Sequence, residues 1–257
     1  MKIFLFLLLL VFSTASAQEQ HFLSTRVLIP CVDMTRYAAF LEKFGFHTSS
    51  QPTMPRESQA EILRLTDGQI FLTLMRVEFK GVHLAMFTDH INDYLKSVPK
   101  EAIANVEHGP GNVVSEVDIS AADGVGIFMH PSSANVMPDS ILNEKIGTFV
   151  EFSIGVPDID KALTFWKTLG YTVTSREAKP HPAARVSDGH FTVGLHTDPD
   201  FNGPALSYAV PNAAVKIAAI RASGIEPIVT LQNKAGDIIG ASFQAPEGLI
   251  INIYQVP

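Results

Sequence analysis

The sequence predicts an α+β protein built from four similar modules, each a strand and a helix followed by three strands. Three observations predict this class: an internal repeat, helix-like segments with capping residues, and strand-like runs separated by Asp-Gly or Glu-Gly turns. The chain has 257 residues, of which 46% are hydrophobic. This length can bury the core of one large domain or of two small ones.

The internal repeat relates the two halves of the chain. VLIPCVDMTRYAAFLEKFGF in the first half aligns with FSIGVPDIDKALTFWKTLGY in the second half. HLAMFTDHINDYLKSV and LSYAVPNAAVKIAAIRASG then repeat the order of strand and helix at nearly the same offset. Four pairs in the first alignment share one offset: Asp33 with Asp158, Phe40 with Phe165, Gly45 with Gly170, and Phe46 with Tyr171.

Each module has local signals for its elements. Asp158 is a candidate N-cap, because its carboxylate can accept the free backbone N–H groups of a first helical turn. Apolar residues then recur at helical spacing up to Leu169, and Gly170 ends the helix as a C′ residue would. Residues 131–147 have the Pro, Ser and Asn content of a connector between halves. Hairpin turns are predicted at Asp67-Gly68, Asp123-Gly124, Asp188-Gly189 and Glu247-Gly248.

The N-terminus has the pattern of a secretory signal peptide. Lys2 is followed by an apolar run over residues 3–12 and by Ala15, Ser16 and Ala17, a small-residue cleavage site. The run is shorter than the roughly 20 residues that a membrane-spanning helix needs, so a stable membrane anchor is not expected. We therefore expect residues 1–17 to be removed and the protein to be exported, either periplasmic or secreted.

Composition and motifs exclude several classes of function. The formal net charge of −7 and the lack of a basic stripe argue against a nucleic-acid partner. Cys31 is the only cysteine, so no intrachain disulfide forms, and its apolar context predicts a buried thiol with no chemical role. The sequence has no nucleophile elbow, P-loop, dinucleotide fingerprint or C-x-x-C pair.

With these modules, the chain resembles the vicinal oxygen chelate superfamily, which includes glyoxalase I, extradiol dioxygenases and fosfomycin-resistance proteins. The motifs that carry the resemblance are VPDIDKALTFWKTLGY and the late strand APEGLIINIY. The resemblance implies four βαβββ modules that form two half-open, barrel-like sheets with the helices packed outside. It implies an N-terminal domain at 22–134, a linker at 135–147 and a C-terminal domain at 148–257. In most members the cleft of such a sheet binds a divalent metal.

The family's ligand positions can be transferred to the second half one at a time. A ligand seven residues before the Asp that opens the helix corresponds to Glu151, where His is usual. A Glu four residues beyond the Gly of a late turn corresponds to Asn252. The other two positions hold Ala205 and a site near Val193, with His190 and His196 close by. Only a partial ligand set remains.

The same spacing rules, applied to the first half, select residues that cannot ligate a metal. These residues are Arg26, Val82 and Phe128. A guanidinium group has donors and no acceptor, so Arg26 cannot be a metal ligand. Arg26 could instead bind an anion or be paired at the surface. We expect the first domain to be metal-free and mainly structural.

Strand alternation predicts which side chains of the second half face its cleft. In VEFSIGV the apolar residues Phe152 and Ile154 would pack under the helix, because successive side chains of a strand point to opposite faces. The same rule buries Val193, Leu195, Ile251 and Ile253. The ligand-binding candidates that it leaves on the open face are Glu151, Ser153, His190, His196, Asn252 and Tyr254.

Two functions follow, and both stay open from the sequence. In the first, the cleft binds a small polar or amphipathic molecule without a cofactor. In the second, Glu151, His196 and Asn252 hold one divalent metal (Zn, Mn, Fe or Ni), and Glu151 is a ligand or a catalytic general base of a lyase, isomerase or dioxygenase. Glu151 could equally be solvated or paired with a lysine, and His190 could simply end a turn. Four modules in one chain allow a monomer or a homodimer.

Overall fold

The computed structural model describes residues 22–49, 61–77, 81–121, 124–132, 146–178, 181–201 and 203–256. The predicted signal peptide, most of the predicted linker, and Asp123 of one predicted turn lie outside these ranges. None of the described helices is long and apolar enough to cross a membrane.

The first half of the chain forms one sheet from two modules. Its strands are ordered β2-β3-β4-β1-β5-β8-β7-β6. The first module consists of β1 (Ser24–Pro30), α1 (Met34–Glu42), β2 (His47–Thr48), β3 (Ile62–Thr66) and β4 (Phe71–Met75). The second consists of β5 (His83–Thr88), α2 (Ile91–Ser97), β6 (Ile103–His108), β7 (Val114–Ser120) and β8 (Gly126–Pro131).

The second half repeats this arrangement in a second sheet, ordered β10-β11-β12-β9-β13-β16-β15-β14. Its first module consists of β9 (Thr148–Gly155), α3 (Ile159–Thr168), β10 (Thr172–Glu177), β11 (Ala183–Ser187) and β12 (Thr192–His196). Its second consists of β13 (Ala205–Val210), α4 (Ala213–Ala222), β14 (Val229–Gln232), β15 (Ile238–Gln244) and β16 (Ile250–Gln255). The predicted α+β class and the four βαβββ modules are confirmed.

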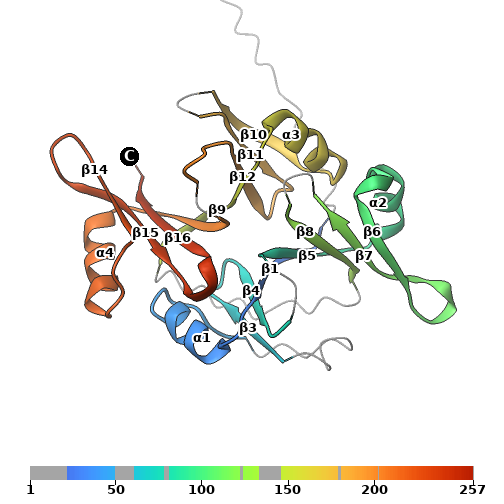
Figure 1. Ribbon diagram of the computed structural model, residues 1–257, viewed down its shortest axis with the longest axis horizontal. Helices are drawn as coiled ribbons and strands as arrows, with labels where there is room; N and C mark the ends of the chain where they lie inside the picture. The colour runs from blue at the N-terminus through green and yellow to red at the C-terminus, as the bar shows by residue number, and fades with distance from the viewer. Residues whose placement is uncertain are drawn as a thin grey trace, which may run out of the picture.

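The two modules of each sheet meet at a central antiparallel pair of strands. This pair is β1 with β5 in the first sheet and β9 with β13 in the second. Each of these strands also pairs in parallel with the last strand of its own module. The sheets stay open, and Figure 1 shows helices α1, α2, α3 and α4 at the outside of the molecule. One face of each sheet is therefore covered by helices, and the other face is available for a site.

The predicted helix cap at Asp158 and the predicted turn at Asp188-Gly189 are present. The Asp158 carboxylate accepts hydrogen bonds from the backbone N–H groups of Asp160 and Lys161, and Gly170 has the positive φ of a C′ residue. The Asp188 carboxylate accepts from the backbone N–H groups of His190 and Phe191, so this turn is closed by a side chain. The expected buried thiol is also found, since Cys31 is 5% exposed, and burial raises its pKa to about 11.

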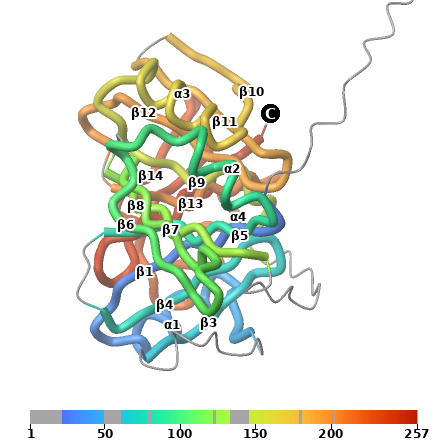
Figure 2. The backbone as a smooth tube through the Cα atoms, turned by 90° about the vertical axis from the view of Figure 1, so that its right-hand side faces the viewer, coloured from blue at the N-terminus to red at the C-terminus, as the bar shows by residue number. Residues whose placement is uncertain are grey.

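A continuous apolar core joins the halves. Phe44 of the first half packs edge-on against Phe243 of the second, with ring centroids 5.3 Å apart, and Phe22 contacts Tyr171. Figure 2 shows α3 of the second half at one end of the molecule and α1 of the first half at the other. A buried polar contact crosses the same interface, because the Tyr208 hydroxyl donates to Asp67 Oδ2 at 2.7 Å.

The contact between Tyr208 and Asp67 makes the first prediction. Asp67 is fully buried, and burial raises its pKa. Tyr208→Phe removes the hydroxyl that donates to Asp67 Oδ2. We therefore expect the free energy of unfolding to fall by about 1–3 kcal/mol in urea titrations.

Tyr37→Phe is the matched control for this prediction. Tyr37 is equally buried, but its hydroxyl has no hydrogen-bond partner among the described residues. The control should cost clearly less than Tyr208→Phe. Equal losses in the two variants would show that the contact between the halves contributes nothing specific.

Candidate functional site

The open face of the second sheet has a buried carboxylate at its centre. Glu151 lies on β9, opposite Ser207 of β13, and its side chain points to the face away from the helices. Its exposed fraction is only 4%. A buried charge is costly unless it is paired and hydrogen-bonded, so the surroundings of Glu151 must compensate for it.

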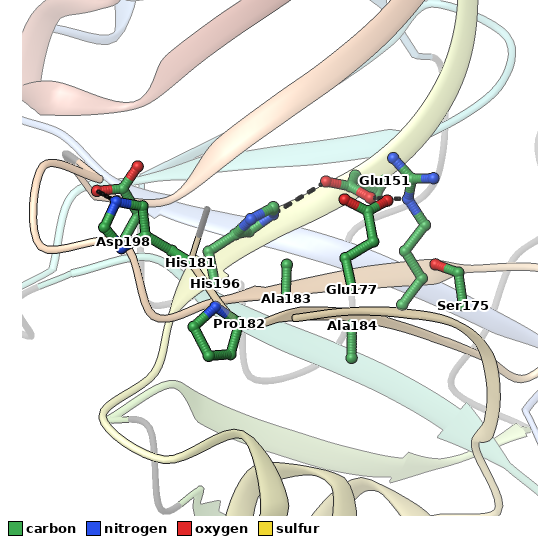
Figure 3. A pocket seen from close by; sticks show the side chains of 10 residues that line it. Glu151, Ser175, Glu177, His181, Pro182, Ala183, Ala184, His196 and Asp198 are labelled. Carbon is green, nitrogen blue, oxygen red and sulfur yellow. Dashed lines mark hydrogen bonds and ion pairs between the residues drawn. The ribbon is translucent and has the colours of Figure 1, made fainter. Parts of the chain in front are cut away.

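Three side chains compensate the Glu151 charge. Arg185 Nε donates to Oε2 in a short ion pair. Ser153 Oγ donates to Oε1 at 2.9 Å, and His196 Nε2 lies 3.1 Å from the same oxygen. The contact of His196 with Glu151 is visible in Figure 3. The carboxylate is thus held from both of its oxygens.

These contacts determine the protonation of Glu151. Burial alone would raise its pKa, but the hydrogen bonds with His196 and Arg185, the charge of Arg185 and the Ser153 hydroxyl lower it from 4.5 to about 2. Burial would likewise lower the pKa of Arg185, yet the hydrogen bond and charge of Glu151 raise it. The pair is therefore ionised on both sides at neutral pH.

A glycine makes the ion pair possible. Arg185 is on β11 and Glu151 is on β9, with β12 between these two strands. Gly194 of β12 pairs with Arg185 and with Ser153. A Cβ atom at Gly194 would lie 2.4 Å from Glu151 Oε1. The two charged side chains can meet because the strand between them has no side chain at this point.

A chain of hydroxyl and amide groups extends the network across the sheet. Ser153 Oγ lies 3.1 Å from Ser207 Oγ, which accepts from Asn252 Nδ2 at 3.4 Å. Asn252 Oδ1 accepts in turn from Ser242 Oγ at 2.7 Å. Asn252 is therefore connected to Glu151 through two serines and makes no direct hydrogen bond with it.

Two adjoining cavities lie over this network, with volumes of about 210 and 510 Å³. Both are lined by Glu151, Arg185, His196 and Asp198. The larger cavity also has an apolar wall, formed by Phe201 and by Ile228, Val229 and Leu231 at β14. Phe201 stacks on the His196 ring at an interplanar angle of 13°. At one end of the smaller cavity, Figure 3 shows His181 beside Asp198.

The structure brings five of the six candidate residues into this cleft. Alternation along the strands is confirmed, because Phe152, Ile154, Val193, Leu195, Ile251 and Ile253 are all buried on the opposite face. The candidates that line the larger cavity are Glu151, Ser153, His196, Asn252 and Tyr254. His190 is exposed at its turn and is not among the described residues that line either cavity.

Arg185 is the functional residue that the sequence did not reveal. The partner of Glu151 is this arginine, where the sequence left a divalent metal, a ligand, solvent or a lysine open. A signal was available, since Arg185 stands between Ala184 and Val186, both of which are buried. Because side chains alternate along a strand, the burial of these two neighbours places Arg185 on the same open face as Glu151.

Arg26, the counterpart of Glu151 in the first half, is not at the surface. It is 3% exposed, and its guanidinium lies 4.6 Å from the centroid of the Phe87 ring. Burial and the charge of Arg64 lower the Arg26 pKa to about 10. The inner faces of the two sheets therefore carry opposite charges at equivalent positions.

The residues of the second-half cleft do not fit a divalent metal of the kind that the resemblance implies. Both oxygens of Glu151 already accept from neighbouring groups, and a guanidinium cation is in contact with one of them. Asn252 Oδ1 is engaged by Ser242. Across the described ranges, no three His, Cys, Asp or Glu side chains gather as a potential metal site.

Solved structures share the fold of this chain. A Mn(II)-bound glyoxalase from Novosphingobium aromaticivorans superposes with a TM-score of 0.61 and 13% identity, over 92% of this chain and 82% of the other. The 2,3-dioxygenase LapB from Pseudomonas sp. KL28 gives 0.60 and 8%, over 92% and 93%. A catechol 2,3-dioxygenase gives 0.58 and 10%, over 90% and 86%.

These likenesses show that the chain has the fold of glyoxalases and extradiol dioxygenases, as the sequence motifs indicated. No model of a known protein family matches the sequence, and no curated protein matches it either. The fold is thus shown, while the activity has to be inferred from the residues of the cleft.

The low pKa of Glu151 makes the second prediction. A carboxylate with a lowered pKa stabilises the folded state above its usual pKa of 4.5, and this contribution is lost as the pH falls towards 2. At pH 7 we expect Glu151→Gln to lower the free energy of unfolding by about 3 kcal/mol. The difference from wild type should shrink between about pH 5 and pH 3 in urea titrations.

Glu226→Gln is the control for this pH dependence. Glu226 is an exposed carboxylate that pairs with Arg221 at 2.8 Å. Its substitution should change stability by less than about 1 kcal/mol at every pH. If Glu151→Gln behaves in the same way, the network does not hold an ionised carboxylate.

The role of Gly194 makes the third prediction. Gly194→Ala should displace the Glu151 carboxylate and lower the free energy of unfolding by about 1–3 kcal/mol. In a Glu151→Ala background the same substitution should cost less, with a coupling of about 0.5–3 kcal/mol in a double-mutant cycle.

Gly109→Ala supplies the comparison for Gly194→Ala. A Cβ atom at Gly109 would lie 3.6 Å from Ser115 Cβ, an ordinary contact. The change in stability should stay within about 0.5 kcal/mol. A coupling near zero between positions 151 and 194 would rule out the steric role of Gly194.

Proposed function

We propose that this is an exported protein that binds a small amphipathic molecule in the cleft of its second half, without a metal ion. The observation that carries the proposal is the cavity of about 510 Å³, which has a hydrogen-bonded polar floor and an apolar wall. Sites for small molecules are typically concave and apolar, with a few fixed polar groups that orient the ligand.

The polar floor is suited to orient a ligand. Glu151 and Ser153 are buried and hydrogen-bonded to each other, so their positions are set before a ligand arrives. His196 is held between Glu151 and the ring of Phe201. Such a preformed floor binds polar groups with little loss of side-chain entropy.

The apolar wall supports an amphipathic ligand in place of a purely polar one. Ile228, Val229 and Leu231 are each about half exposed, although they are large and hydrophobic. Together they border the cavity beside the polar floor. Apolar side chains that gather at a hollow typically mark a binding surface.

The charge of Arg185 supports binding without a metal. A divalent metal needs lone pairs that are free to coordinate, and those of Glu151 are already shared with Arg185, Ser153 and His196. The guanidinium would also repel a second cation beside it. The Glu151 carboxylate is thus neutralised by the guanidinium of Arg185.

The alternative is a metal-dependent lyase, isomerase or dioxygenase, and it is less well supported. An efficient general base has a pKa near the operating pH. The pKa of Glu151 is about 2, so at neutral pH this carboxylate is a weak base. Glu151 therefore serves to position Arg185 and His196.

Export rests on the N-terminal sequence, which lies outside the described residues. The apolar run at residues 3–12 and the Ala-Ser-Ala triplet support it. A binding protein outside the cytoplasm would meet its ligand in the periplasm or the medium.

A neutral fluorescent probe tests the proposal. We expect N-phenyl-1-naphthylamine to bind the purified protein with increased emission, because its rings can cover the apolar wall. Leu231→Asp should weaken this binding about tenfold or more, since a charge in the wall loses the apolar contact. Leu231 is 50% exposed, so the variant should still fold.

Val113→Asp is the matched control. Val113 is 63% exposed in the first half, away from the cleft, and its substitution should leave probe binding unchanged. Equal binding by wild type and Leu231→Asp would contradict the proposed cleft. Elemental analysis of protein purified without chelators tests the other part, and one divalent ion per chain that is lost in Glu151→Gln would contradict metal-free binding.

A further inference from the structure

Arg185 reaches the cleft with only part of its guanidinium engaged. The Nε atom donates to Glu151. Among the described residues, no other group accepts a hydrogen bond from the guanidinium. A guanidinium has five N–H donors in a fixed plane. The four donors on the two terminal amino groups are therefore available to a ligand. The Arg185 side chain is 41% exposed and lines both cavities.

The contact with Glu151 fixes the orientation of the Arg185 guanidinium. Glu151 is buried and is held by Ser153 and His196, so Arg185 is anchored to a carboxylate that cannot easily turn. An anchored guanidinium loses little side-chain entropy when it accepts a ligand. Its terminal amino groups match the two oxygens of a carboxylate, which they bind in a bidentate manner.

The rim of the cleft carries negative charges that oppose an anionic ligand. Glu177, Asp198 and Asp200 stand there. The carboxylate of Asp198 is near His181 Nε2, at 3.8 Å, and accepts from the Asp200 backbone N–H. Glu177 is exposed on β10, and solvent screens exposed charges more strongly than the half-buried Arg185. Asp198 is about as exposed as Arg185, so an anionic ligand needs direct contact with the guanidinium to offset the repulsion from the rim.

We propose that the ligand of this cleft is an amphipathic monocarboxylate, whose carboxylate pairs with the terminal amino groups of Arg185. This inference rests on the function proposed above and specifies its ligand class. The apolar body of the ligand packs against Ile228, Val229 and Leu231. Arg185 is thus the residue that determines specificity, and Glu151 is a positioning residue that acts through it.

Three unbranched probes with eight carbon atoms each test the charge preference. Octanoate, octan-1-ol and octylammonium are titrated into the purified wild-type protein by isothermal titration calorimetry at about pH 7. We expect octanoate to bind about tenfold more tightly than octan-1-ol, and octylammonium to bind more weakly than octanoate. In Arg185→Gln the three affinities should come within about threefold of each other, whereas Arg185→Lys should keep part of the preference.

A second variant does not disturb the buried pair. Glu177→Gln removes an exposed negative charge near Arg185 and should tighten octanoate binding by about two- to fivefold, with octan-1-ol unchanged. Glu226→Gln removes another exposed carboxylate, one that pairs with Arg221, and it should change neither affinity.

The outcomes separate this inference from the proposed function. Equal binding of the three eight-carbon compounds, or preference for octylammonium, overturns the carboxylate assignment while the cleft remains a binding site. Binding of N-phenyl-1-naphthylamine without binding of octanoate has the same meaning. If N-phenyl-1-naphthylamine does not bind the wild-type protein, the proposed function itself is overturned.

Discussion

The ion pair between Glu151 and Arg185 is the constraint on which the cleft depends. A carboxylate at the centre of a sheet has lost its water and must be compensated by its neighbours. Arg185 supplies the opposite charge, while Ser153 and His196 supply hydrogen bonds. Gly194 supplies the space, because any larger residue would occupy the position of the carboxylate.

The first half shows that the fold does not require this pair. Arg26 and Arg64 occupy positions in the first sheet that correspond to Glu151 and Arg185, and Arg64 pairs with Thr73 where Arg185 pairs with Gly194. The inner face there also carries a separate apolar cluster of Leu28, Ala85 and Phe87. The same backbone thus supports two different chemistries on its inner faces, because the core that stabilises it lies on the outer, helix-covered faces.

Much of the fold could be predicted because its signals are local. Asp158 caps the first turn of its helix and Gly170 ends that helix, and neither role depends on distant residues. The face of Glu151 was also predictable, since alternation along a strand fixes it. The partner of Glu151 was not predictable, because β11 reaches β9 only across β12 and the register of three strands decides which side chains meet. The role of Gly194 was not predictable for the same reason.

The choice of an arginine as the partner of Glu151 limits what the cleft can do. A metal ion would offer open coordination positions and could polarise a bound oxygen. A guanidinium offers directed N–H donors with a pKa too high to release a proton, so it can orient and neutralise a ligand but cannot exchange protons with it. The lowered pKa of Glu151 makes this carboxylate a weak base at neutral pH. An arrangement of this kind favours recognition over turnover, which is why the charges of the cleft, more than its fold, support a binding protein.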